Sequence, residues 1–330
     1  MTRTVGNQFE FNLIELLPLA PTYQRSQELL TAYNPKTREY TVAVQNYPGV
    51  GIDTYFVVSI SNDVTSATSI HSNIIIGHPD GQPGNVGTKT LTKILIDKDD
   101  RTVALFNDGS LHLIDIPGKA YTQVSNILTP AKDIVPATTQ VTKAHLVVDT
   151  KLKSLIYDQL SNQAYIVVTD MSSSPYQVAS PVAIQPYSKL NGAEAPIAAH
   201  QVTDPNTGIS QFAVIFAGNF DRLMWVDETT GKQTDIIDDM YGDATGTGAD
   251  LTCDEGTKDC DTEWSTSAYD PVSNIVYIQA HAVQDDDSSE TMIYGVQFLA
   301  NKVTKVYYPY LDPLVDMNFG YSGYQWVTFQ

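Results

Sequence analysis

Polar side chains recur at one fixed distance before a repeated turn signal in this sequence. The turn residues are Asn34, Asp97, Asp149, Asp204, Asp270 and Gly320. The residues four positions earlier are Leu30, Lys93, His145, His200, Thr266 and Asp316, of which five are polar or ionisable. Side chains four residues apart share one face of a β-strand. Brought together, these groups could transfer protons, hold a metal ion or orient a polar ligand.

The residue types suggest a division of roles. His145 and His200 are the candidate acid–base groups or metal ligands, and Asp316 would orient them or balance their charge. Lys93, Thr266 and Trp264 are the candidate ligand-binding residues. Hydrolysis, opening of a lactone-type ring, or a proton-transfer lyase or cyclisation step needs such groups and no bulky cofactor. The alternative is that water simply solvates these polar positions.

An acidic segment supplies a second set of candidate ligands. Residues 238–263 contain nine carboxylates and one lysine. The predicted metal ligands there are Asp238, Asp239, Asp243 and Asp250. Ca²⁺ is the expected ion, or else another divalent metal, because Ca²⁺ takes six to eight oxygen ligands. The spacing does not fit an EF-hand loop, so a solvated acidic rim or a funnel for cationic ligands stays open as an alternative.

Two cysteines in the same segment bear on the compartment. Cys253 and Cys260 are close enough in sequence to close a small disulfide ring, which predicts an oxidising, extracellular environment. Two free thiols in a cytoplasmic loop are the alternative. The N-terminal sequence lacks the apolar core and cleavage site of a signal peptide, so if the protein is secreted, we expect this chain to be its mature form.

Charge and composition exclude several partners. The chain has 330 residues, a net charge of −19 and 42% hydrophobic residues. Such acidity repels nucleic-acid phosphates and anionic lipid, and no stretch of 18 apolar residues could span a membrane. The expected partner is a small-molecule ligand or substrate, including a cationic or carbohydrate one.

The turn signals define an internal repeat. Alternating apolar residues lead to the Asp or Asn, a short turn follows, and a second β-rich run begins, as in TKILIDKDDRTVALF and TSAYDPVSNIVYIQA. Asp and Asn side chains favour such turns, and the Pro at 35, 205 and 271 pre-sets the turn's φ. Six units of about 55 residues, with four strands readable in the clearest copies, are typical of propeller blades.

We therefore expect one all-β domain over residues 1–330, a six-bladed β-propeller with blades of four antiparallel strands. The sixth repeat has only two strands, so the N-terminal run at residues 6–16 is expected to pair with it and close the ring. At the level of fold the pattern resembles six-bladed propellers such as the gluconolactonase-like, strictosidine-synthase-like and NHL-type proteins. The resemblance covers the whole chain but includes no metal-ligand motif, and fold similarity does not carry function.

The loop lengths predict which face carries the site. Turns after the first and third strands are short, whereas connections on the opposite face are long, at 46–54, 71–90, 185–197, 238–263 and 285–290. Long loops on a rigid scaffold commonly hold binding sites. The leading interpretation is an enzyme, a hydrolase, lactonase or lyase/cyclase, with its site at that mouth of the central channel. The alternative is a secreted, non-catalytic recognition module of the lectin or adhesion type, binding sugars or a basic partner.

Overall fold

The computed structural model describes the central part of the chain, with gaps. The described residues are 29–34, 36–46, 54–61, 70–77, 91–118, 120–130, 133–185, 194–203, 208, 210–218, 222–238, 261–270, 274–283, 289–299 and 302–307. All regular elements in these ranges are β-strands. None of these ranges contains a helix long and apolar enough to cross a membrane.

The strands form five consecutive antiparallel sheets. The first contains β1 (Leu29–Asn34), β2 (Glu39–Asn46), β3 (Thr54–Ser61) and β4 (Ile70–Gly77). The second contains β5 (Leu91–Ile96), β6 (Thr102–Phe106), β7 (Ser110–Asp115) and β8 (Ala120–Asn126). The third contains β9 (Gln140–Val148), β10 (Lys151–Asp158), β11 (Gln163–Asp170) and two short strands that both pair with β11, β12 (Gln177–Val178) and β13 (Val182–Ala183).

The last two sheets repeat the same order. The fourth contains β14 (Glu194–Thr203), β15 (Ser210–Gly218), β16 (Arg222–Val226) and β17 (Gln233–Asp238). The fifth contains β18 (Asp261–Asp270), β19 (Ile275–Val283), β20 (Ser289–Leu299) and β21 (Lys302–Tyr307). The strands of the first, second, fourth and fifth sheets pair in chain order, so each of these sheets is a simple meander. In the third sheet β9, β10 and β11 pair in the same way.

The predicted turn residues mark the ends of the first strands. β1 and β18 end at Asn34 and Asp270, while β5, β9 and β14 end one residue before Asp97, Asp149 and Asp204. The Asn34 side chain accepts hydrogen bonds from the backbone N–H groups of residues 36 and 37 at 2.9 and 3.2 Å. This is the local bonding that the sequence pattern predicted, because Asn and Asp side chains can bond the backbone two residues on.

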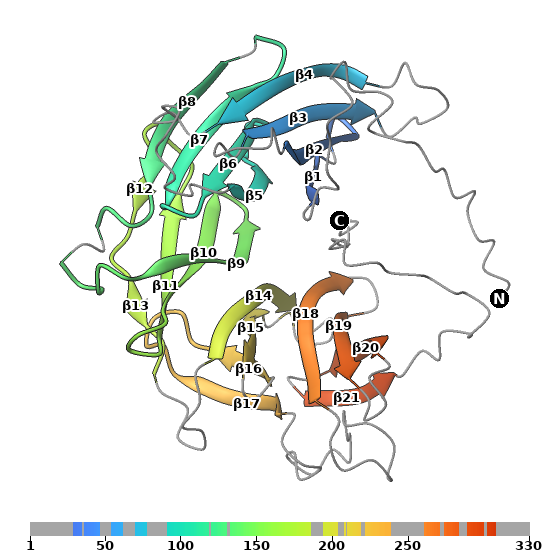
Figure 1. The fold of residues 1–330 in the computed structure, drawn as a ribbon. Helices are drawn as coiled ribbons and strands as arrows, with labels where there is room; N and C mark the ends of the chain where they lie inside the picture. The colour runs from blue at the N-terminus through green and yellow to red at the C-terminus, as the bar shows by residue number, and fades with distance from the viewer. Residues whose placement is uncertain are drawn as a thin grey trace, which may run out of the picture.

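The five sheets follow one another around an arc, with β1, β5, β9, β14 and β18 on its inner side (Figure 1). Each of these first strands contacts the first strand of the next sheet. The repeat assigned to a sixth blade, with its turn at Gly320, and the N-terminal run at residues 6–16 lie outside the described residues. The observed fold is therefore an arc of five antiparallel sheets.

The hydrophobic core lies between neighbouring sheets. The first and second sheets share a buried cluster that includes Leu30, Val57, Ile94 and Phe106. A second cluster joins the second and third sheets, and a third joins the third and fourth through residues such as Leu155 and Phe212. The second and third sheets each take part in two of these clusters, so they bury apolar residues on both sides. One such sheet alone would leave apolar surface exposed, which favours the packing of sheet against sheet.

Polar groups also connect the sheets. Lys153 on β10 donates hydrogen bonds to Gln201 on β14 at 2.7 Å and to Glu228, just after β16, at 2.8 Å. The Lys153 side chain is 10% exposed and its ammonium lies 5.3 Å from the centre of the Phe212 ring. A buried ammonium needs such partners to offset its desolvation. The contact therefore specifies how the third and fourth sheets pack together.

The second and third sheets are tied at the Asp97 turn. One Asp97 carboxylate oxygen accepts hydrogen bonds from the Tyr176 hydroxyl at 2.9 Å and from Arg101 Nε at 2.8 Å. Tyr176 precedes β12 and is 3% exposed. Burial, followed by the Asp97 carboxylate, raises the pKa of Tyr176, so its hydroxyl stays protonated and donates.

We expect Tyr176→Phe to lower the free energy of unfolding by about 1.5–3 kcal/mol, because it removes a buried hydrogen bond to a charged group. Urea denaturation measures the change. The matched control is Tyr157→Phe, which removes an exposed hydrogen bond to Asn162 and should cost about 1 kcal/mol or less. Equal losses in the two variants would contradict a special role for the Asp97 contact.

Several predicted loops are shorter than expected. Residues 71–90 were predicted as a connection, but β4 occupies Ile70–Gly77. Strands also occupy the ends of three other predicted loops. β14 begins at Glu194 within 185–197, and β20 begins at Ser289 within 285–290. β17 extends to Asp238 and β18 begins at Asp261, at the two ends of 238–263. The outer strands β4 and β17 pair on one side only. Their alternation of apolar and polar residues is therefore weakly constrained and hard to read from sequence.

Candidate functional site

A local irregularity of the inner strands sets the position of the candidate residues. In β5, Thr92 is an extra residue between the pairs Leu91–Phe106 and Lys93–Leu105. Corresponding register shifts occur in β9, β14 and β18, next to Thr142–Ala144, Ile197 and Ser265. A β-bulge re-aims the side chains beside it and increases the local twist. Lys93, His145, His200 and Thr266 each follow such a bulge by one to three residues.

Lys93 lies in the third position of β5 and its side chain is partly buried. Across the described ranges its ammonium has no hydrogen bond or ion pair. Burial lowers the pKa of Lys93 from its usual value. A positive charge without a local counter-charge is costly in this setting, which favours a bound anion or loss of the proton.

His145, the sixth of nine residues in β9, is 6% exposed. Its Nε2 lies within hydrogen-bond distance of the Thr142 carbonyl oxygen. Burial, and then the charge of Lys93, lower the pKa of His145 to about 3, so the ring is neutral at pH 7. Because a carbonyl only accepts, Nε2 carries the single ring proton and Nδ1 is an acceptor. Nδ1 is buried and has no hydrogen-bond partner in the described part of the chain.

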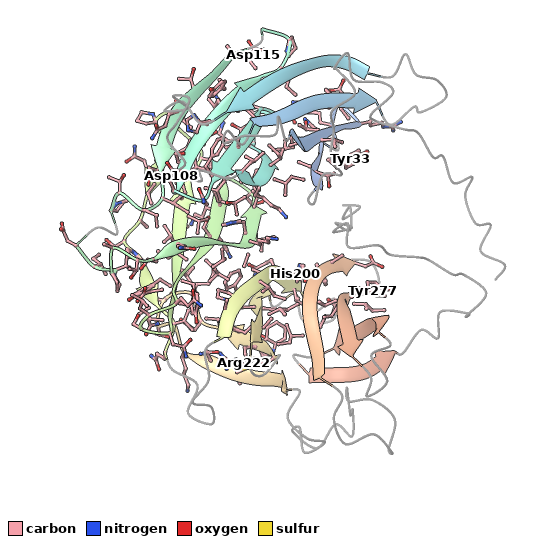
Figure 2. The ribbon with its side chains drawn as sticks, in the orientation of Figure 1. Tyr33, Asp108, Asp115, His200, Arg222 and Tyr277 are labelled. Atoms are coloured by element: carbon pink, nitrogen blue, oxygen red, sulfur yellow. The ribbon has the colours of Figure 1, made fainter. Side chains whose placement is uncertain are left out.

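His200 occupies the matching position in β14 and is 8% exposed. Its Nε2 lies 2.6 Å from the Ser267 hydroxyl on β18, the next inner strand. Figure 2 labels His200 on the fourth sheet. Its ring also stands 6.3 Å from the ring of Tyr269. Burial, with a smaller contribution from Lys93, lowers the pKa of His200 to about 4. This imidazole is therefore also neutral at pH 7.

The three groups form one electrostatic unit. The charge of Lys93 lowers the pKa of both histidines, although the three residues come from three successive sheets. The contacts of β5 with β9 and of β9 with β14 make this proximity possible. In the pH range where a lysine loses its proton, both imidazoles are neutral and exert no charge on Lys93. Burial is therefore the cause that lowers the pKa of Lys93. That these three residues make up one functional site stays a prediction.

The remaining predicted site residues lie in β17 and β18 or outside the described part of the chain. Trp264 and Thr266 lie in β18 on either side of the bulge at Ser265, paired with Ala280 and Gln279. Asp238 is the last residue of β17. The other residues predicted for the site, the metal and the disulfide lie outside the described part: Asp316, Asp239, Asp243, Asp250, Cys253 and Cys260. Within the described ranges, no group of three or more His, Cys, Asp or Glu side chains could hold a metal ion.

Sequence reasoning missed the groups that orient the two histidines. Thr142 belongs to the bulge of β9 and donates its hydroxyl to the Leu155 carbonyl oxygen at 2.8 Å. Ser267 directly follows Thr266, one of the predicted site positions. The strand repeat placed Ser267 beside the site, but alternation assigns it to the opposite face. The bulge at Ser265 could not be read from the sequence.

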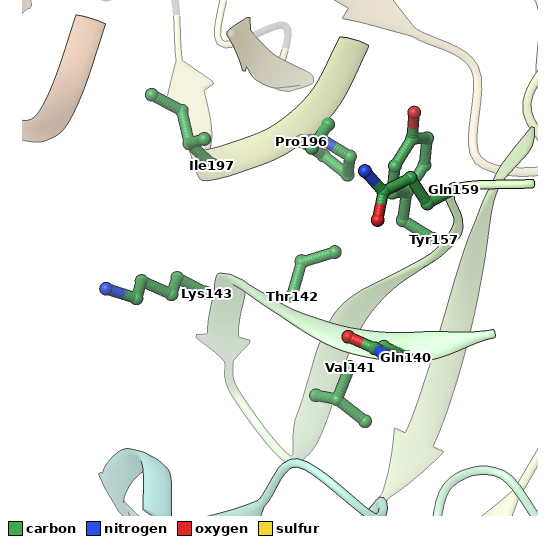
Figure 3. Close-up of a pocket in the computed structure, with 9 residues that line it drawn as sticks. Gln140, Val141, Thr142, Lys143, Tyr157, Gln159, Pro196 and Ile197 are labelled. Atoms are coloured by element: carbon green, nitrogen blue, oxygen red, sulfur yellow. The ribbon is translucent and has the colours of Figure 1, made fainter. Parts of the chain in front are cut away.

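A separate pocket of about 250 Å³ lies between the third and fourth sheets (Figure 3). It is formed by the beginnings of β9 and β14 and by the turn after β10. Its lining residues are Gln140, Val141, Thr142, Lys143, Tyr157, Gln159, Ala195, Pro196 and Ile197. The start of each first strand and the turn after each second strand lie at the same end of a meander. The pocket therefore lies on the face predicted to carry the long loops.

Comparison with known proteins gives a fold but no family. No protein-family model and no curated protein sequence matches the chain. Among solved structures, the Dos1 propeller matches over 84% of this chain with 12% sequence identity and a TM-score of 0.50. The chain spans 60% of the length of that structure. The tail fibre of Staphylococcus aureus phage P68 covers 90% of this chain and 77% of its own with 10% identity, but its TM-score of 0.27 carries no structural argument. The antiparallel four-stranded sheets and the first of these similarities support a propeller-like, all-β fold.

Proposed function

We propose that this protein binds a small molecule in the central channel of a six-bladed propeller and acts on it by proton transfer. The supporting observation is the electrostatic unit of Lys93, His145 and His200. It combines a cation, a buried imidazole acceptor and a second imidazole that is oriented by Ser267. A hydrogen-bond donor and a hydrogen-bond acceptor on the inner side of the arc can bind a polar ligand and transfer a proton to or from it.

Hydrolysis of a lactone or ester is the reaction class that these groups serve most directly. Water adds to the acyl carbon, the acyl C–O bond breaks, and the leaving oxygen receives a proton. His145 Nδ1 would accept the proton from the attacking water and then return it to the leaving oxygen. The Lys93 ammonium would stabilise the negative charge that develops on the acyl oxygen. A lyase or cyclisation step would use the same acceptor on a C–H or O–H group.

A panel of small lactones and esters tests this proposal, with acid release followed by a pH indicator. We expect turnover of at least one panel member, and a loss of about 10²–10⁴-fold in kcat/KM for His145→Gln, the range for general acid–base catalysis. Lys151→Met, at an exposed lysine of β10, is the control and should keep the wild-type rate. Absence of turnover, together with no thermal stabilisation by any panel compound, would overturn the proposal.

A recognition module is the second candidate, and the pocket between the third and fourth sheets favours it. The pocket combines the rings of Tyr157 and Pro196 with the side-chain amides of Gln140 and Gln159 (Figure 3). Rings can stack on the apolar face of a sugar while amides bond its hydroxyl groups. This candidate, acting outside the cell, predicts glycan binding that is lost in Gln159→Ala but unchanged in His145→Gln.

A further inference from the structure

We infer that the pocket between the third and fourth sheets binds the acetamido group of an N-acetylated sugar. The inference rests on the recognition module proposed above, because it names the ligand class of that same pocket. It is carried by the side chains of the lining, which combine a buried apolar wall with two exposed carboxamides. An acetamido group, a methyl joined to an amide, has the matching chemistry.

The inner wall of the pocket is apolar. Val141 is 8% exposed and Pro196 is buried, while Ala195 and Ile197 are partly buried. The hydroxyl groups of a plain hexose would lose water against this wall without gaining a hydrogen-bond partner. A methyl group loses no hydrogen bond there, and its burial is favourable. The wall therefore selects a sugar that carries an apolar substituent.

Two glutamine side chains supply a polar part of the lining. Gln140 at the start of β9 and Gln159 in the turn after β10 are both exposed. Each carboxamide has an acceptor oxygen and two N–H donors, so the pair can bond the N–H and the C=O of one acetamido group. None of the nine lining residues has a carboxylate, so an ammonium group on the sugar would lose water without gaining a counter-charge from the lining. An N-acetylated amino sugar is therefore favoured over the free amino sugar.

Hydrogen bonds hold one end of the pocket in place before a ligand binds. The Tyr157 hydroxyl donates to the Asn162 side-chain oxygen at 2.7 Å, which fixes the orientation of the ring. The turn that carries Gln159 is held by the Asp158 carboxylate, which accepts a hydrogen bond from the backbone N–H of Ser161 at 3.0 Å. Figure 3 shows Tyr157 and Gln159 at the same end of the pocket. A preformed site loses less conformational entropy when a ligand binds.

N-acetylglucosamine, glucose and glucosamine form a matched set of probes. They share one ring and differ at one carbon, which carries an acetamido group, a hydroxyl or an ammonium. Binding to the full chain is measured by ligand-observed saturation-transfer NMR, below the pKa of the sugar amine and with titrations for the dissociation constants. We expect saturable binding of N-acetylglucosamine with the largest transfer at its acetyl methyl, about tenfold weaker binding of glucose, and no binding of glucosamine.

Two variants locate the binding in this pocket. Ala195→Leu fills the space beside the apolar wall and should abolish binding of N-acetylglucosamine. Gln159→Ala removes a hydrogen bond to the ligand and should weaken binding by about tenfold or more. The control is Gln177→Ala, at an exposed glutamine of β12 outside the pocket, which should bind normally. Thermal denaturation verifies that each variant remains folded.

The outcomes separate this inference from the recognition module itself. If glucose binds as tightly as N-acetylglucosamine, or if Ala195→Leu and Gln159→Ala both bind it normally, the acetamido assignment is wrong. Absence of binding by all three probes also overturns the assignment. The recognition module is judged separately, by binding of oligosaccharides that lack N-acetyl groups to the wild-type chain and to Gln159→Ala.

Discussion

Gly231→Ala is expected to lower the free energy of unfolding by about 2–5 kcal/mol, the sum of a strained backbone and a steric overlap. Gly231 has a φ of +69° in the turn between β16 and β17. A Cβ atom there would lie 1.9 Å from the Ala183 carbonyl oxygen in the third sheet. The Gly231 carbonyl oxygen also accepts a hydrogen bond from Gln185 N at 2.8 Å, so the third and fourth sheets meet at this glycine. Urea denaturation measures the loss.

Gly208→Ala is a matched control for this prediction. Gly208 has the same φ of +69°, but a Cβ atom there would meet nothing within 4 Å among the described atoms. Its substitution should cost only the conformational strain, about 1–2 kcal/mol. The difference between the two variants isolates the overlap with Ala183. If both substitutions destabilise the protein equally, the contact between the two sheets at Gly231 is not tight.

The second large effect is a loss of stability in mild acid. His145 and His200 have folded-state pKa values of about 3 and about 4, below the ordinary value of 6.5. Above pH 6.5 both are neutral in the folded and unfolded states and make no contribution. As the pH falls below about 6.5, the unfolded chain binds protons that the folded protein does not. The free energy of unfolding should then fall by about 1.4 kcal/mol per pH unit for each histidine.

Urea denaturation at several pH values between about 6.5 and 4.5 measures this slope. Lowered pKa values at Asp99, Asp158, Asp170 and Asp227 act only at lower pH, as the pH falls below about 4. His145→Gln should reduce the slope by about 1.4 kcal/mol per pH unit, whatever its effect at pH 7. Lys93→Met should also reduce it, because both folded-state pKa values would rise. An unchanged slope in both variants would show that the two imidazoles are not held neutral.

The sequence predicts the parts of this fold that depend on local bonding. Turn residues such as Asn34 and Asp97 could be read because their own side chains bond the neighbouring backbone. Their regular spacing indicated where the inner strands end. Contacts between sheets could not be read in the same way. Lys153 and Glu228 are 75 residues apart, and no local pattern indicates that they meet.

In the candidate site, too, the positions that depend on local strand geometry could be predicted and the contacts between strands could not. Counting four residues back from each turn selected Lys93, His145 and His200, because strand alternation holds between these positions and the turn. Their protonation states and the roles of Thr142 and Ser267 depend on burial and on bulges. One extra residue changes which side chains face inward, and its place in the strand has no clear sequence signal. The acidic segment was read from composition alone.

The bulges in β5, β9, β14 and β18 also separate two kinds of sequence change. Each irregularity is confined to the pairing of an inner strand with the second strand, and in the third and fifth sheets the pairing of the second and third strands keeps an unbroken register. A substitution beside a bulge therefore alters what the molecule presents at its centre while the sheet keeps its pairing. Four of the five sheets have such a bulge, and the candidate positions that follow it carry three residue types: Lys93, His145 and His200, and Thr266. The side chain beside each bulge can therefore change in one sheet without disturbing the strand pairing of the others.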